Sequence, residues 1–196
     1  MIHRRLVGES MRSVIVSRSA ILLLIITALL GACKESATVR LAPGQGFVQL
    51  QGAELILKRD LAVLAGHARV FVQDGRAMLR GLDRHLAHCA FEVQRVNHDG
   101  FTIKAGTFRV IQVQGSMQQV VLAEPVLLAS LQLSAGIGDA GSSIYHEGYH
   151  FWLASETQPE VRRMSCYGVY ADPPNLEPPS LQEIDAVLGD IAEIRP

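Results

Sequence analysis

The sequence of 196 residues predicts a mainly β protein, an antiparallel sandwich or barrel-like sheet with one C-terminal amphipathic helix packed on it. Two observations support this fold class. From Phe47 onward, short apolar-rich runs alternate with Gly, Asn-Asp or Pro, a pattern typical of strands and turns. Seven or more such runs suit a sandwich or a barrel. Apolar residues recur at helical spacing in the last segment, after Ser180.

Residues 1–32 have the layout of an export signal. A basic stretch comes first and contains Arg4, Arg5, Arg12 and Arg18. The uncharged apolar run that follows, Ala20–Leu30, is shorter than the roughly twenty residues that a membrane-spanning helix needs. It ends in Leu30-Gly31-Ala32-Cys33, which resembles the lipobox of bacterial lipoproteins. That resemblance implies that residues 1–32 are removed and that Cys33 becomes the lipidated N-terminus, carrying fatty acids such as palmitate.

Two alternatives stay open for the signal. An ordinary secreted protein with an incidental Cys33 is one, although the small residues directly before the cysteine favour lipidation. Translation from Met11 instead of Met1 gives a signal of more usual length.

Lys34, in place of an aspartate, resembles the pattern of lipoproteins passed on to the outer membrane. We therefore expect a lipid-anchored protein of the cell envelope that faces the periplasm, at the outer membrane.

Composition limits the mature part to one domain. Removal of residues 1–32 takes away four of the 18 Lys and Arg residues and one of the 19 Asp and Glu residues. The resulting net charge of −4 argues against a nucleic-acid partner. The small and polar residues 33–46 are expected to form a lipidated tether with nothing to bury. Residues 47–196 are expected to form a single β-rich domain.

The strands are expected in order along this domain. The candidates are Val48–Leu57, Arg69–Gln73, Thr107–Gln114, Val120–Ala123, Val126–Leu133, Ile144–Ala154 and Val161–Tyr170. The clearest hairpin spans Ala90–Ile111, where alternating residues lead into the turn sequence Asn97-His98-Asp99-Gly100 and resume at Phe101. The glycine-rich segment Ser134–Ser143 is expected to be a loop or a wide turn.

The C-terminal segment predicts a helix. Ser180 and Glu183 have the spacing of a capping box, and an apolar face follows that consists of Leu181, Ile184, Val187, Leu188, Ile191 and Ile194. We expect this face to pack on the sheet. A helix lying on the membrane is the alternative, but its acidic polar face would be repelled by anionic lipid.

Cys89 and Cys166 remain after lipidation, and in an oxidising compartment an even pair is expected to form a disulfide. Two buried free thiols are an alternative. A metal site is another, because Arg84-His85-Leu86-Ala87-His88-Cys89 brings two imidazoles and a thiol together, with His98 close if the hairpin forms. Surface histidines beside a structural cysteine explain this run better, because no second close ligand pair completes a tetrahedral set.

The segment His146-Glu147-Gly148-Tyr149-His150 spells H-E-x-x-H, the zinc signature of many metallopeptidases. On a helix the two imidazoles share one face and reach one zinc, with Glu147 activating its water. On a strand they stand about 13 Å apart and cannot share a metal. Gly148 and the surrounding aromatic residues favour a strand, so we expect a chance match and no metal, cofactor or catalytic residue here.

Other candidates are weaker. Arg162 and Arg163, with Arg109, could line a patch for an acidic partner, but exposed strand residues explain them as well. No serine-hydrolase elbow, phosphate loop or dinucleotide motif occurs in the mature chain.

Several segments resemble those of a set of uncharacterised proteobacterial lipoproteins. They are Arg69–Gly75, Asp83-Arg84, His88–Val93, Thr107–Val110, Phe151–Glu156, Val161–Arg163 and Cys166. The resemblance covers most of the mature domain and implies the envelope location and a single domain, without an assigned activity.

We therefore expect a non-enzymatic binding or structural module of the envelope, held to a membrane by its lipid, with an envelope protein or a small ligand as partner. A zinc-dependent hydrolase using His146, Glu147 and His150 is one alternative. A β-barrel carrier of a lipid-like ligand is the other, and it would require an apolar interior cavity.

Overall fold

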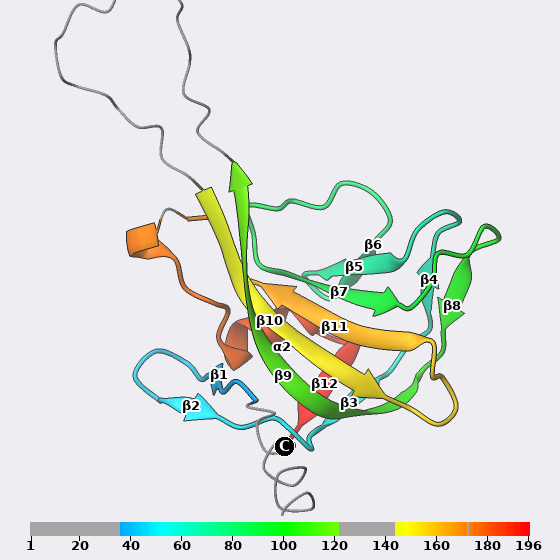
Figure 1. Ribbon diagram of the computed structural model, residues 1–196, viewed down its shortest axis with the longest axis horizontal. Coiled ribbons are helices and arrows are strands. Elements are labelled where there is room, and N and C mark those ends of the chain that lie inside the picture. Colours follow the sequence, from blue (N-terminus) through cyan, green and yellow to red (C-terminus); the bar gives the residue numbers. More distant parts are fainter. Residues whose placement is uncertain (1–35, 122–143, 172) are drawn as a thin grey trace, which may run out of the picture. The chain divides into compact units, whose positions relative to one another are not determined.

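A curled, antiparallel sheet of eight strands dominates the computed structural model, which describes residues 36–121, 144–171 and 173–196 (Figure 1). The strand order is β12-β3-β9-β10-β11-β7-β5-β6. Their bounds are β3 Glu54–Leu57, β5 Arg69–Gln73, β6 Arg76–Met78, β7 His88–Val93, β9 Gly106–Val121, β10 Ile144–Ala154, β11 Val161–Tyr167 and β12 Ala192–Arg195. With the helix α2, Leu181–Leu188, this architecture confirms the predicted β-rich fold class with a single α-helix.

Two small antiparallel pairs accompany the large sheet. β1, Val39–Arg40, pairs with β2, Phe47–Val48, and β4, Leu61–Val63, pairs with β8, Phe101–Ile103. A single 3-10 turn, η1, spans Pro173–Asn175. Among the described residues no helix has the length and apolar character needed to cross a membrane.

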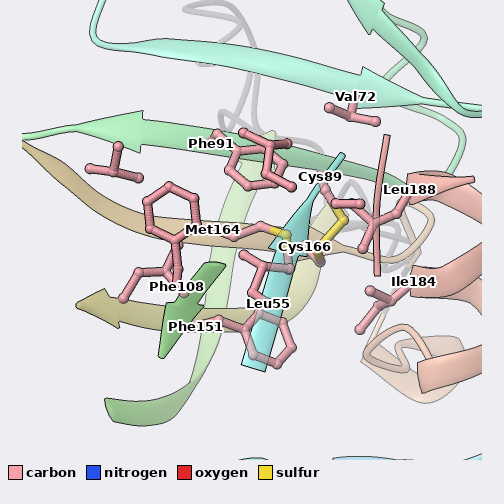
Figure 2. Packing of buried hydrophobic residues seen from close by; sticks show 14 of the residues in the cluster. Leu55, Val72, Cys89, Phe91, Phe108, Phe151, Met164, Cys166, Ile184 and Leu188 are labelled. Carbon is pink, nitrogen blue, oxygen red and sulfur yellow. A yellow bond between two sulfur atoms is a disulfide. The ribbon is translucent and has the colours of Figure 1, made fainter. Parts of the chain in front are cut away.

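The sheet has an apolar face and a polar face, because successive side chains of a strand point to opposite sides. On β10, Tyr149, Phe151 and Leu153 belong to the hydrophobic core, whereas His146 and His150 alternate with them. The core fills the space between the apolar face and α2, and Figure 2 shows Phe91, Phe108, Phe151 and Met164 packed there with Ile184 and Leu188. We call the opposite side the polar face; it carries His88, Glu92, His146, His150, Ser165 and Tyr167.

Part of the expected tether packs on the domain. Ala37 N–H donates to Val113 O at 2.8 Å, and Val113 N–H donates to Ser36 Oγ at 2.9 Å. Val39 is fully buried in the core. The expectation that residues 33–46 have nothing to bury is therefore wrong for residues 36–40, because one buried valine and four hydrogen bonds to β9 and to Tyr149 hold them on the domain.

The predicted hairpin at Ala90–Ile111 is wrong in its pairing. The turn chemistry is present, since Asn97 Oδ1 accepts from Asp99 N–H and Gly100 has a φ of +84°. However, both edges of β7 are occupied, by β11 and β5, so the chain leaving β7 pairs β8 with β4 instead. The turn connects two different sheets.

The C-terminal helix is shorter than predicted. Both halves of the Ser180–Glu183 capping box are formed, and Ile184, Val187 and Leu188 are buried against the sheet. The helix ends at Gly189, whose φ of +50° suits glycine and where an added Cβ would lie 2.8 Å from Gly75 Cα. The chain after it forms the edge strand β12, so Ile191 and Ile194 do not continue the helix.

Several strands match the predicted bounds. Arg69–Gln73 and Ile144–Ala154 agree at both ends, and Val161–Tyr170 ends earlier, at Tyr167. β9 extends through the expected Thr107–Gln114 strand to Val121. The signal with Cys33 and Lys34 lies outside the described residues, as do the second half of the strand expected at Val120–Ala123, the whole strand expected at Val126–Leu133 and the segment Ser134–Ser143.

Candidate ligand site on the polar face

The H-E-x-x-H segment lies in the strand β10, as predicted. Its central residue, Gly148, is required by a close contact with the neighbouring strand. A Cβ on Gly148 would lie 2.1 Å from Cys166 O and 2.7 Å from Cδ1 of Tyr167 on the neighbouring strand. The missing side chain therefore lets the Tyr167 ring lie over the strand between the two histidines. His146 stacks on this ring with centroids 4.5 Å apart, and His150 meets it edge-on at 6.0 Å.

A zinc peptidase needs this segment to be on a helix, whereas here it is on a strand. In β10 the two imidazoles are separated by the intervening tyrosine ring, and each has its own hydrogen-bond partner. His146 Nε2 lies 2.8 Å from Gly168 O, and His150 Nδ1 lies 2.8 Å from Ser165 Oγ. Within the described ranges, no three side chains of His, Cys, Asp or Glu are grouped to hold a metal ion.

A buried polar chain joins three strands beside this ring. Ser165 Oγ donates to Glu92 Oε1 at 2.8 Å, so it accepts from His150, whose hydrogen is therefore on Nδ1. Arg163 donates to Glu92 Oε2 at 3.1 Å through Nε. Burial, the largest single effect, raises the pKa of Glu92, but the bonds from Ser165 and Arg163 outweigh it, and the pKa is lowered. Glu92 is thus an ionised, fully engaged carboxylate.

The buried histidines are held neutral. Burial, followed by the nearby charge of Arg163, lowers the pKa of His150 to about 4. Burial also lowers the pKa of His146 to about 4 and outweighs the opposing bond to Gly168, with smaller contributions from the charges of His88 and Arg84. An ordinary histidine has a pKa near 6.5, so both imidazoles are uncharged at neutral pH.

His88 is buried with them, which corrects the expectation of surface histidines in this run. It is 5% exposed, lies 5.1 Å from the His146 ring between centroids, and has Nδ1 3.0 Å from Leu86 O. Burial lowers its pKa as well. His85 and His98 are exposed, as expected.

Cys89 is not available as a thiol ligand for the metal site considered for the segment Arg84–Cys89. Cys89 forms a disulfide with Cys166, its directly opposite partner on β11, with Cα atoms 4.1 Å apart. Both sulfurs belong to the apolar core, on the side of the sheet opposite His88 (Figure 2). The expected pairing is therefore present in the structure.

A pocket of about 290 Å³ opens on the polar face. Its lining comprises Arg69, Phe71, Arg84, His88, Ala90, Glu92, Gln118, Gln119, Val120, His146, Ser165, Tyr167 and Tyr170. The wall residues are positioned by hydrogen bonds and ring contacts: Gln118 Nε2 donates to the Tyr167 hydroxyl at 2.8 Å, and the Tyr170 ring packs edge-on against His146 at 4.5 Å. This pocket is our candidate site.

A larger depression of about 610 Å³ lies at the other end of β7. It is bordered mainly by the exposed residues 94–99 of the loop before β8, with Pro159 and Glu160. Its lining lacks the buried, hydrogen-bonded polar side chains of the first pocket, so we do not take it as the site.

Sequence reasoning found the two histidines of β10 and His88 but missed their partners. Glu92, Ser165 and Tyr167 come from strands about 70 residues apart along the chain, and no local pattern brings them together. Arg163, expected on the surface, is largely buried and bound to Glu92, and it also packs 5.2 Å from the Trp152 ring. The polar residues alternating with the core of β7 and β11 were the available signal.

Comparisons with protein-family models, with curated proteins and with solved structures found no match for this chain.

Proposed function

We propose that this chain is a lipid-anchored module of the cell envelope that binds a small polar ligand without chemically changing it. The pocket on the polar face is the observation that carries the proposal. It combines cationic, imidazole and phenol groups from β5, β7, β10, β11 and two connecting segments around one concave space. Such a concave space with a few well-held polar groups is the usual form of a small-molecule site.

Rigidity supports binding as its role. The wall side chains project from paired strands and are fixed by hydrogen bonds, as in the chain Glu92–Ser165–His150. Preorganised walls reduce the ordering cost of association. The hydrogen-bonded, neutral imidazoles serve this positioning role in the proposal.

The position of the pocket distinguishes this proposal from the carrier of a lipid-like ligand. A carrier would hold its ligand inside the apolar core, but in the described part of the chain that space is filled by side chains such as Leu55, Phe91, Phe108 and Phe151. The pocket lies on the opposite side and is lined largely by polar groups. A water-soluble ligand fits it better.

The binding half of the proposal is tested by a thermal-shift screen of small envelope metabolites against the full chain, purified in a non-ionic detergent. We expect at least one ligand to raise the melting temperature. Tyr170→Ala removes a pocket wall and should weaken that ligand at least tenfold, whereas Tyr145→Ala, outside the lining, should not. A ligand whose affinity ignores Tyr170→Ala would place binding elsewhere.

The anchoring half is tested separately. Cells expressing the chain are labelled with radioactive palmitate, and their membrane and soluble fractions are compared. We expect label and membrane association for the natural chain and neither for Cys33→Ala. Label retained by Cys33→Ala would refute lipidation at that residue.

A further inference from the structure

From two arginines that line the pocket, Arg69 and Arg84, we infer that the ligand is a small hydroxylated anion, such as a sugar acid or a sugar phosphate. This inference rests on the proposed binding function and adds the chemical class of the ligand. The charge of the two guanidinium groups and the acceptor nitrogens of the neutral histidines carry it.

The two arginines come from different elements and meet at one pocket. Arg69 lies on β5 and Arg84 in the connection before β7, and both contribute to the lining. Neither forms an ion pair with any described residue. Arg69 lies opposite Glu92 on β7, and its charge helps to lower the pKa of that carboxyl without a direct ion pair. Guanidinium groups without a direct ion pair are well suited to bind a carboxylate or a phosphate in a bidentate manner.

The carboxylate in the lining does not cancel this charge. Glu92 is bound by Arg163 at 3.0 Å and by Ser165 at 2.8 Å, so its negative charge is already compensated from within the sheet. The net charge of the side chains that line the pocket is therefore positive, although the mature chain as a whole is acidic. An anion gains most from Arg84, and at Arg69 it shares the guanidinium charge with Glu92.

The imidazoles supply hydrogen-bond acceptors. His146 donates through Nε2 to Gly168 O, which leaves Nδ1 as an acceptor, and His88 donates through Nδ1 to Leu86 O, which leaves Nε2 as an acceptor. Acceptor nitrogens repel a bare anion but match the hydroxyl groups of a sugar. The combination of guanidinium donors and imidazole acceptors thus selects a ligand with both a negative group and hydroxyls.

The size agrees with a monosaccharide-scale ligand. The volume of about 290 Å³ lies just below the range for sites of drug-sized molecules, roughly 300 to 1,000 Å³. Aromatic side chains in the lining, Phe71 and Tyr170, offer apolar contact for one face of a sugar ring.

Isothermal titration of the full chain in non-ionic detergent tests the inference with four probes: glucuronate, glucose 6-phosphate, glucose and glucosamine. We expect one or both anions to bind at least tenfold more tightly than glucose, and glucosamine to bind no better than glucose. Which anion is tighter distinguishes a carboxylate ligand from a phosphate ligand.

Variants connect the charge to the arginines. Arg69→Gln and Arg84→Gln should each weaken the preferred anion about tenfold and leave glucose unchanged. Arg109→Gln is the matched control, because Arg109 is exposed on β9 and lines neither the candidate pocket nor the larger depression. Circular dichroism of each variant checks that the fold is retained.

Two results would overturn the inference. One is anion binding that is equal to glucose binding or unaffected by both arginine variants. The other is the absence of binding by either anion at millimolar concentration. The proposed function would survive both results if the metabolite screen finds a neutral or cationic ligand that depends on Tyr170, so the two failures are distinguishable.

Discussion

The apolar face and the polar face of the sheet place different requirements on a buried side chain. On the apolar face, Phe91, Phe108 and Phe151 are fully buried and need only fit. On the polar face, buried groups such as His150 and Ser165 need a partner for each donor and acceptor. The side chains expected to contribute most to stability therefore lie on one side of the sheet and the candidate ligand site on the other, so variants can separate the two.

Truncation on the apolar face should have the largest effect. Phe151→Ala removes a fully buried ring and is expected to lower the free energy of unfolding by about 3–5 kcal/mol, measured by urea denaturation. Phe47→Ala is the matched control, because Phe47 is 68% exposed and its loss should cost at most about 0.5 kcal/mol. Equal losses would mean that the apolar face is not the centre of stability.

The disulfide should rank next. Cys89→Ala with Cys166→Ala opens a loop with a sequence separation of 77 and should lower the free energy of unfolding by about 4 kcal/mol in the chain-entropy model. Free-thiol counting under denaturing conditions in the Cys33→Ala variant checks the bond itself: no thiol before reductant, two after it. Two thiols without reductant would contradict the bridge.

Gly148→Ala should break the polar face while sparing the core. The new methyl group would overlap the backbone of β11 and the Tyr167 ring, and we expect a loss of about 2 kcal/mol. Gly115→Ala on the adjacent strand is the control, because a Cβ there meets nothing within 4 Å and should be neutral or slightly stabilising. Similar effects of the two variants would show that the Tyr167 ring does not lie over Gly148.

Acid should weaken the polar face with the smallest effect per group. His146 and His150 have a folded-state pKa of about 4 and an unfolded value near 6.5, so the unfolded chain binds more protons between these pH values. The stability that they contribute is therefore complete above about pH 6.5 and falls as pH drops toward 4, by roughly 1–2 kcal/mol for each. Urea midpoints at pH 7.5, 6 and 5 measure it.

The matching control replaces the titrating groups. His146→Gln with His150→Gln should flatten the pH dependence over this interval, whereas His98→Gln, in an exposed turn, should leave it as it is. An unchanged slope in the double variant would assign the effect to other groups.

The strands were predictable where the signal is local. Ile144–Ala154 and Arg69–Gln73 were located because alternation and flanking breakers mark a strand in its own sequence. The capping box was readable for the same reason, although the close approach of Gly75 that ends α2 at Gly189 was not.

Strand pairing and the site required long-range information. The turn at Asn97–Gly100 suggested a hairpin, but the occupied edges of β7, set by distant β5 and β11, redirected β8 to β4. The partners of the histidines were missed for this reason too. Whether Arg163 faces solvent or Glu92 depends on which strand lies beside β11.

The disulfide between Cys89 and Cys166 can form only in one register of β7 and β11. A slip of one residue between β7 and β11 would turn every side chain of one strand to the other face and carry the two sulfurs apart. The bond can therefore close only in the alignment that sets His88 opposite Tyr167 and Ala90 opposite Ser165. An oxidised chain therefore has the alignment of β7 and β11 that forms one wall of the candidate pocket, although the disulfide itself lies on the other side of the sheet.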